Sequence, residues 1–252
     1  MKFDEVKTIY VVPYSHIDWQ WRNNRRYFIH RNRQVIFAAI DFLESNRQYR
    51  WSGIERSHII GDFWNAYPSL REPLVRAVRE GRCDLGGSTH GTPLSAWVEE
   101  ELFFRNLLYG KRFYERLFGK VRDSFLYFAD VPVTFAQVPQ IAKKFGFEYF
   151  IVDRPSEALG LKGIPRQFRW RGPDGSDLLV DRTMYGRTFP GTGGNHVSCS
   201  PGIFPALAER TKKLLDYFLH DGVAPIVYLP DSNDWAFPTL NCRNSWNGGM
   251  QP

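Results

Sequence analysis

His16 and Asp18 are the first side chains in the chain whose types and spacing could do chemistry. They follow the apolar, strand-like run 9–12 and Pro13, which has no N–H to donate to a neighbouring strand. Residues two apart at a strand end point to the same face, so this imidazole and carboxylate could grip one divalent ion. The simpler alternative is a histidine held by a nearby carboxylate, which is common in proteins.

Two tryptophans, Trp19 and Trp21, follow this pair directly. Indole rings offer flat apolar surface beside the polar cluster. Sugar rings present C–H faces that stack on such surfaces. We therefore predict a carbohydrate site in which Trp19 and Trp21 contact the substrate.

Two further carboxylates, Asp130 and Asp234, come at the ends of apolar, strand-like runs. A carboxylate that leaves such a run needs a metal, an arginine or hydrogen bonds. Two carboxylates and a metal allow glycoside hydrolysis, in which one attacks the anomeric carbon and the other protonates the leaving oxygen. They equally allow deacetylation by a metal-activated water. Either aspartate alone could instead be a helix N-cap or a turn residue.

Extended and helical patterns alternate along the chain. We expect strands near 9–12, 49–55, 124–130, 147–153 and 224–234, and a hairpin over 168–180. We expect the segment 83–91 to be a short strand that runs into a glycine-rich turn. We expect helices near 31–45, 58–81 (broken at Pro68 and Pro73), 96–117, 135–145 and 206–219, and a long loop over 186–202. This alternation predicts an α/β fold: a largely parallel sheet, or an irregular seven-stranded β/α barrel, covered by helices.

Ligands in such folds bind at the carboxyl ends of the strands. Polar side chains fall at those ends with a regularity that scattered turn residues would not show. They are His16, Asp18, His90, Asp130, Arg154, Asp231, Asn233 and Asp234.

The composition is ordinary for a soluble globular protein, with 43% hydrophobic and 24% charged residues and a net charge of +6. The basic residues are scattered except near 22–33, which we predict to be a solvated helix face rather than a nucleic-acid surface. The three cysteines form no C-x-x-C pair, so neither a disulfide framework nor a zinc knuckle is indicated. With no apolar signal or membrane-length run, we expect a cytoplasmic protein, whose oligomeric state the sequence leaves open.

Several motifs in order resemble glycoside hydrolase family 38, the class II α-mannosidases, over nearly all of 8–240. They are PYSHIDWQW, the strand that ends at Asp130, QVPQIAKKFGFEYFIVDR, EGRCDLGGS, LLYGKRFYERLFG, FRWRGPDGSDLLV and PDSNDWAFP. The resemblance implies a retaining α-mannosidase catalytic domain over 1–240, followed by an irregular tail over 241–252. It also implies a carbohydrate substrate with terminal α-mannose and a divalent metal, usually zinc.

Matched residue by residue, the resemblance makes His16 and Asp18 metal ligands and Asp130 both a ligand and the nucleophile. It makes Asp234 the general acid/base. Trp21 then matches an aromatic residue of the sugar subsite, and Arg154 an arginine that follows the next strand. We expect Arg154 to hydrogen-bond a carboxylate of the site, with Asp130 as the first candidate.

The chain also departs from the family pattern. Tyr14 stands where the family usually has histidine, Asp130 is followed by Val-Pro-Val instead of an aromatic-glycine pair, and 88–92 lacks the usual tryptophan and acid. The family's fourth metal ligand is a histidine that would lie downstream of this chain, and His90 and His196 are alternative candidates. We therefore expect little or no turnover from this chain alone.

Two other functions fit parts of the pattern. One is a non-catalytic sugar-binding domain on the same fold, against which the presence of both Asp130 and Asp234 argues. The other is a metal-dependent polysaccharide deacetylase, which would be expected to carry an adjacent acidic pair and a His-x-x-x-His motif. The sequence contains neither in a suitable place.

Overall fold

The computed structural model describes residues 8–20, 23–87, 89–92, 98–120, 125–128, 130–132, 135–182 and 226–231, with the backbone alone for 8–13 and 226–231. Trp21, His196 and Asp234 lie outside these ranges, as do the expected loop over 186–202 and the expected helix over 206–219.

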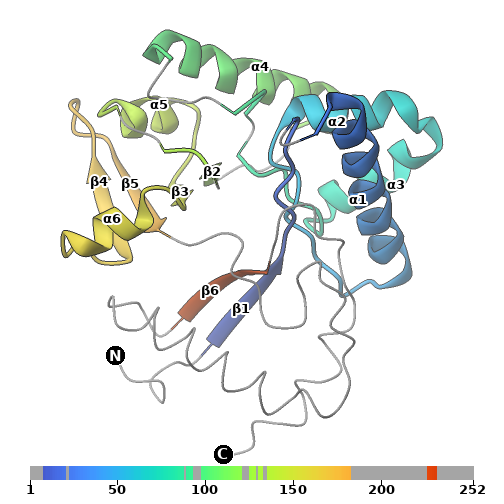
Figure 1. The fold of residues 1–252 in the computed structure, drawn as a ribbon, viewed down its shortest axis with the longest axis horizontal. Helices are drawn as coiled ribbons and strands as arrows, with labels where there is room; N and C mark the ends of the chain where they lie inside the picture. The colour runs from blue at the N-terminus through green and yellow to red at the C-terminus, as the bar shows by residue number, and fades with distance from the viewer. Residues whose placement is uncertain are drawn as a thin grey trace, which may run out of the picture.

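The described strands form two sheets (Figure 1). In the first, β1 (Thr8–Pro13) pairs in parallel with β6 (Ile226–Asp231), and Pro13 lies opposite Asp231. In the second, whose order is β2-β3-β5-β4, β2 (Phe125–Phe128), β3 (Tyr149–Val152) and β5 (Asp177–Arg182) are parallel. The expected hairpin is confirmed, because β4 (Gln167–Arg171) pairs antiparallel with β5. The fold is thus mixed α/β with mostly parallel pairing, although the described strands do not close into a seven-stranded barrel.

The helices are α1 (Arg25–Ser45), α2 (Ser57–Ala66), the 3₁₀ turn η2 (Pro68–Leu70), α3 (Arg71–Arg79), α4 (Glu100–Phe118), α5 (Val138–Lys144) and α6 (Ser156–Leu161). The helix α1 begins six residues before the expected start because Asn24 caps it, accepting a hydrogen bond from Tyr27 N at 2.9 Å. Pro73 does not break α3, since it lies in the first turn, where a missing N–H costs nothing. Within the described residues, no helix is long and apolar enough to cross a bilayer.

The strand expected over 49–55 is wrong as a continuous element, and the short strand expected at the start of 83–91 is reduced to a bridge, whereas the expected glycine-rich turn is present. The two segments meet only at two isolated parallel bridges, Trp51–Cys83 and Arg56–Thr89. Gly86 and Gly87 have φ values of 59° and 93°, which turn the chain out of the extended conformation between the bridges. The first segment nevertheless contacts the loop after β1 through Arg56, and the second lies against β2 at Gly87.

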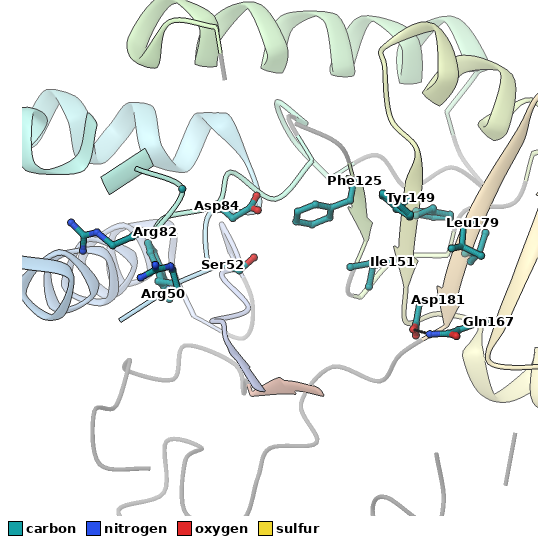
Figure 2. Close-up of a pocket in the computed structure, with 14 residues that line it drawn as sticks. Arg50, Ser52, Arg82, Asp84, Phe125, Tyr149, Ile151, Gln167, Leu179 and Asp181 are labelled. Carbon is teal, nitrogen blue, oxygen red and sulfur yellow. Dashed lines mark hydrogen bonds between the residues drawn. The ribbon is translucent and has the colours of Figure 1, made fainter. Parts of the chain in front are cut away.

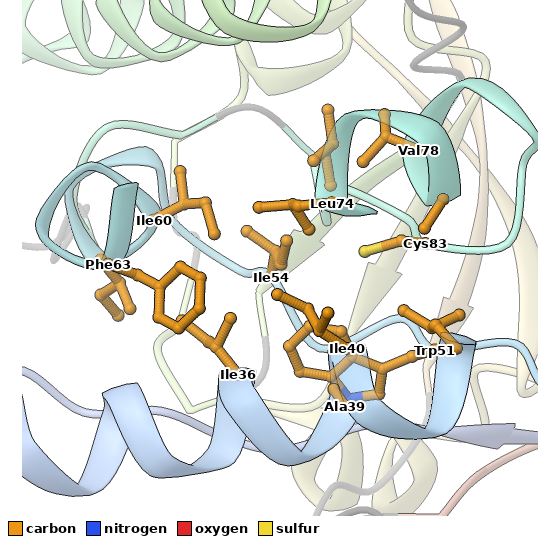
Figure 3. Packing of buried hydrophobic residues seen from close by; sticks show 14 of the residues in the cluster. Ile36, Ala39, Ile40, Trp51, Ile54, Ile60, Phe63, Leu74, Val78 and Cys83 are labelled. Carbon is orange, nitrogen blue, oxygen red and sulfur yellow. The ribbon is translucent and has the colours of Figure 1, made fainter. Parts of the chain in front are cut away.

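Two hydrophobic cores flank these segments. In the helical core, α1, α2 and α3 pack against Trp51, Ile54 and Cys83 (Figure 3). In the sheet core, α5 packs against residues of β2, β3 and β5 such as Phe128 and Phe150. Figure 1 shows α4 running over both groups: its first half supplies buried residues to the sheet core and its last turns to the helical core. One long helix therefore fixes the two cores relative to each other.

The close approach of 83–89 to its neighbours depends on the glycine pair. A Cβ on Gly87 would lie 2.8 Å from Tyr127 N and 3.0 Å from Leu126 Cα, and one on Gly86 would lie 2.3 Å from Ile54 O. These distances are shorter than real Cβ contacts, and the atoms concerned belong to the backbone. Any side chain larger than hydrogen would push this segment away from β2.

We expect Gly87→Ala to lower the free energy of unfolding by more than about 3 kcal/mol, measured by urea denaturation. Its positive φ alone costs about 1–2 kcal/mol for alanine, and the backbone clash adds to that. The matched control is Gly175→Ala, because Gly175 has a similar φ of 83° but a Cβ added to it would meet no atom within 4 Å. Equal losses in the two variants would contradict the close approach to β2.

Candidate functional site

His16 lies in the loop that leaves β1, and its side chain is buried. Two contacts hold this loop from outside. Arg56 Nη1 donates to Ile17 O at 2.9 Å, and Asn32 Nδ2 of α1 donates to Asp18 O at 2.8 Å. The imidazole is therefore placed by the segment 51–56 and by the first long helix.

The two edges of the His16 ring face different groups. On one edge, Nε2 lies 3.5 Å from Asp18 Oδ1 and 3.8 Å from Asp130 Oδ2. On the other edge, Nδ1 lies 3.1 Å from Glu55 Oε1 and 3.3 Å from the Tyr14 hydroxyl. The structure thus brings together three of the predicted residues, His16, Asp18 and Asp130.

Asp130 follows β2, and Arg154 follows the neighbouring parallel strand β3. Arg154 Nη2 lies 2.5 Å from Asp130 Oδ1, which confirms the contact expected from the sequence. Asp153 N also donates to Phe128 O at 3.1 Å, so the loop after β3 is tied to the end of β2. Arg182, buried at the end of β5, donates to Ser156 O and holds this loop from the other side.

Glu55 is a buried residue of the site that the sequence reasoning missed. Its carboxylate accepts hydrogen bonds from Tyr14 Oη and from Arg56 Nη1, in addition to its contact with His16. Burial raises the pKa of Glu55 to about 7, although the neighbouring Arg56 acts to lower it. Glu55 ends the expected strand 49–55, so the strand-end criterion that singled out Asp130 could have found it.

Two other predicted residues, Trp19 and His90, make their described contacts outside the His16 cluster. Trp19 packs against the helical core, with its ring 4.6 Å from that of His58 and the Arg25 guanidinium 4.5 Å above it. His90, an alternative fourth ligand, has Nδ1 2.9 Å from Ser57 Oγ and therefore faces the start of α2.

The fit of a divalent ion can be judged from the donor atoms. Two donors that each bind a zinc-like ion at about 2.0–2.2 Å lie roughly 3–4 Å apart. The distances from His16 Nε2 to Asp18 and Asp130 fall in that range, and nitrogen with carboxylate oxygen is a suitable donor set. Nevertheless, no group of three or more His, Cys, Asp and Glu side chains among the described residues is arranged to hold a metal ion. The pairs fit, but a complete ligand set is not formed by the described residues.

A cavity of about 500 Å³ lies elsewhere (Figure 2). It is lined by Phe125 and Tyr149, the first residues of β2 and β3, and by Leu179, Trp51 and Asp84. The cavity therefore reaches the amino ends of β2 and β3, whereas Asp130 and Arg154 follow the carboxyl ends of the same strands. Ligands in open parallel sheets bind at the carboxyl ends, so we place the candidate site at the His16 cluster and not in this cavity.

His58 is the group near the cluster with the clearest consequence for pH dependence. Burial lowers the pKa of His58 to about 4, and the charges of Arg56 and Arg25 act in the same direction. Its Nδ1 contacts His90 O, so the neutral ring donates a hydrogen bond inside the fold. The folded protein therefore favours the uncharged imidazole.

We expect this histidine to make the protein less stable in acid. Between pH 6.5 and pH 4 the unfolded chain binds a proton at residue 58 more readily than the folded chain. The neutral His58 ring contributes up to about 3 kcal/mol to the free energy of unfolding. This contribution is complete above pH 6.5 and is lost as the pH falls toward 4. Urea denaturation of His58→Asn should show a shallower loss over this window, whereas replacing the exposed His30 in the same way should not. An unchanged slope in His58→Asn would contradict the assignment.

Comparison with known proteins agrees with this arrangement. The model of the glycosyl hydrolases family 38 N-terminal domain matches residues 6–218. Alpha-mannosidase G of Dictyostelium discoideum is 30% identical over 193 residues, which are 68% of this chain and 16% of that protein. This chain thus spans about a sixth of the length of that curated relative.

Solved structures show the same fold. An α-mannosidase from Enterococcus faecalis V583 superposes with a TM-score of 0.72 at 17% identity, covering 92% of this chain and 26% of that one. A putative polysaccharide deacetylase from Mycobacterium smegmatis superposes less well, with a TM-score of 0.55 at 10% identity over 94% of this chain and 80% of that one. The family match over residues 6–218, most of the chain, shows that the chain belongs to glycoside hydrolase family 38.

Proposed function

We propose that this domain hydrolyses terminal α-mannosides with retention of configuration, using Asp130 as nucleophile and Asp234 as general acid/base. The observation that carries the proposal is the position of Asp130, paired with Arg154 at 2.5 Å and facing His16 at the carboxyl edge of the strands. Membership of family 38 supports glycoside hydrolysis, and the α-mannosidase names of its relatives support mannose as the sugar.

The proposed reaction has two steps. In the first, Asp130 attacks the anomeric carbon as the glycosidic bond breaks, and Asp234 gives its proton to the leaving oxygen. In the second, Asp234 takes a proton from water, whose oxygen displaces Asp130 from the same carbon. Arg154 binds one oxygen of Asp130 and fixes the orientation of the carboxylate. β6 ends at Asp231, which lies opposite Pro13, so the carboxyl end of β6 is at the edge from which the His16 loop leaves.

We further propose His16, Asp18 and Asp130 as ligands of a divalent cation, with zinc as the first candidate. The spacing of these donors around His16 Nε2 supports the assignment. When bound, such a cation would supply a positive charge that attracts sugar hydroxyl groups and offsets the two carboxylates.

The sugar contacts in this proposal come from Trp21, Arg154 and Trp19. Arg154 is half exposed beside Asp130, so its guanidinium lies where a sugar hydroxyl can approach it. The Trp19 ring is already covered by Arg25 and His58, which favours a supporting role for it. Trp21 is then the aromatic residue that we propose to stack on the sugar.

The same proposal extends to the organisation of the chain. Residues 1–240 would form one catalytic domain that closes into an irregular seven-stranded β/α barrel, and residues 241–252 would form a tail. The parallel pairing of β1 with β6, and of β2, β3 and β5, supports such a closed arrangement. The cytoplasmic setting expected from the sequence is part of the same proposal.

An activated fluoromannosyl fluoride tests the nucleophile even if turnover is slow. Attack by Asp130 expels fluoride and leaves a mannosyl ester, which mass spectrometry of the peptides can place. We expect the label on the peptide that contains residue 130, and no label in Asp130→Asn. Asp174→Asn is the control, because Asp174 lies in the exposed turn between β4 and β5.

The slow hydrolysis of an aryl α-mannoside that we expect from this chain should fall by about a thousandfold, or below detection, in Asp130→Asn, as expected for loss of a nucleophile. Hydrolysis that survives this change, or a label on another carboxylate, would refute the role of Asp130. Sugar binding without any label would favour the non-catalytic alternative. A deacetylase forms no glycosyl ester, so it would also give no label, but it would release acetate from an acetylated oligosaccharide.

We expect Asp18→Asn and His16→Ala each to weaken zinc binding by more than about a hundredfold, measured by isothermal titration calorimetry. Each change removes a donor atom from the pair around His16 Nε2. His30→Ala is the control, because His30 is exposed on α1. Zinc affinity that is the same in all three variants would place the cation elsewhere or exclude it.

A further inference from the structure

The edge of His16 that faces away from Asp18 and Asp130 is occupied by a second carboxylate. Glu55 Oε1 lies 3.1 Å from His16 Nδ1, within hydrogen-bonding distance. When Glu55 is ionised, well above its pKa of about 7, its carboxylate can only accept, so the hydrogen of this bond then belongs to Nδ1. The neutral ring then carries no hydrogen on Nε2, the atom that faces Asp18 and Asp130.

We propose that Glu55 is a positioning residue that holds His16 in the Nδ1–H tautomer and turns the bare Nε2 toward Asp18 and Asp130 to receive a divalent cation. The inference rests on the proposed function, since the cation is the one proposed for the mannoside site. The claim about the ring itself can be tested without any hydrolysis.

The surroundings of Glu55 favour its acceptor role. Arg56 Nη1 donates to Glu55 Oε2 at 2.5 Å, and the Tyr14 hydroxyl donates to Oε1. The side chains of Glu55 and Arg56 are 3% and 8% exposed, so water does not compete for the carboxylate. Bonds to ionised groups in such a dry site are strong, and together they fix the direction of both carboxylate oxygens.

The competing ring state is less well supported by the distances. In the Nε2–H tautomer the hydrogen would point at carboxylate oxygens 3.5 and 3.8 Å away, which is longer than a normal N–H···O hydrogen bond. It would also leave Nδ1 as a lone pair facing Glu55, with acceptor against acceptor. The shorter contact to Glu55 therefore decides the tautomer.

A carboxylate behind a histidine also matters for cation binding. Histidine ligands commonly donate their second ring N–H to such a group, which fixes the ring and makes the ligating nitrogen more basic. Tyr14 strengthens the arrangement, because its ring packs edge-on against Tyr127 at 5.1 Å while its hydroxyl reaches Glu55. Tyr127, in the carboxyl half of β2, is thus linked through Tyr14 to the carboxylate that orients His16.

Glu55→Gln gives a sharp test because it changes the chemistry but hardly the shape. The amide has one accepting oxygen, and the Arg56 guanidinium, which can only donate, should take it. The amide NH₂ then faces His16 Nδ1, which must become an acceptor. We therefore expect this variant to move the ring into the Nε2–H tautomer.

Long-range ¹H–¹⁵N correlation spectra of the ¹⁵N-labelled chain report which ring nitrogen carries the hydrogen. They would be recorded without metal at about pH 9, above the usual pKa of imidazole. The His16 signals are those that vanish in His16→Asn. We expect Nδ1–H in the wild type, Nε2–H in Glu55→Gln, and Nδ1–H in the control Asp84→Asn, whose carboxylate accepts from Gly86 N and does not contact His16 in the described contacts. Wild-type His16 in the Nε2–H form, or Nδ1–H retained in Glu55→Gln, would overturn the proposal.

Zinc calorimetry gives the second readout. We expect Glu55→Gln to weaken zinc binding by about 10–100-fold, as is usual when the group behind a ligating histidine is lost, and Asp84→Asn to leave it unchanged. Unaltered zinc affinity in Glu55→Gln would also overturn the proposal. Failure of the mannoside assays alone would refute the proposed function but leave the tautomer result standing, so the two failures can be told apart.

Discussion

The buried ion pair of Glu55 and Arg56 is the constraint on which the site depends. A charge out of water must be paired and hydrogen-bonded, and removing either partner would leave the other unpaired at a cost of about 3–5 kcal/mol. The pair meets this requirement by binding the loop after β1: Arg56 reaches Ile17 O, and Glu55 reaches Tyr14 and His16. The position of the His16 loop is therefore set by its hydrogen bonds to this buried ion pair as well as by packing.

A second constraint brings Asp130 to this loop. The segment 83–89 lies between the Glu55 segment and β2, and it can do so only because Gly86 and Gly87 let backbone touch backbone on both sides. α4 packs on both hydrophobic cores and holds the two halves at this spacing. The 3.8 Å distance between Asp130 and His16 is thus a consequence of packing far from either residue.

Much of this could be predicted from the sequence, since strands and helices that alternate place their polar end residues at one edge. What failed had specific physical causes. The segment 49–55 looks like a strand but forms one isolated bridge, at Trp51, with a second at the following Arg56, because the glycine turn interrupts its neighbour. Glu55 was not predicted because, in a sequence, an acid next to an arginine is typical of a solvent-exposed ion pair. The structure shows that this pair is buried. Trp19 has a side chain of the kind that often stacks on sugars, yet the Arg25 guanidinium lies over its ring.

The charges around His16 suggest why a cation belongs there. Asp18, Glu55 and Asp130 carry three negative charges when ionised, and Arg56 and Arg154 carry two positive ones, so one negative charge is left over. Each arginine serves a different carboxylate, Arg56 binding Glu55 and Arg154 binding Asp130. Asp18 is the acid of the cluster without an arginine partner among these contacts, and it lies beside Nε2. Because Glu55 orients that nitrogen as a lone pair, the unbalanced charge and the lone pair point to the same place, where a divalent ion would satisfy both.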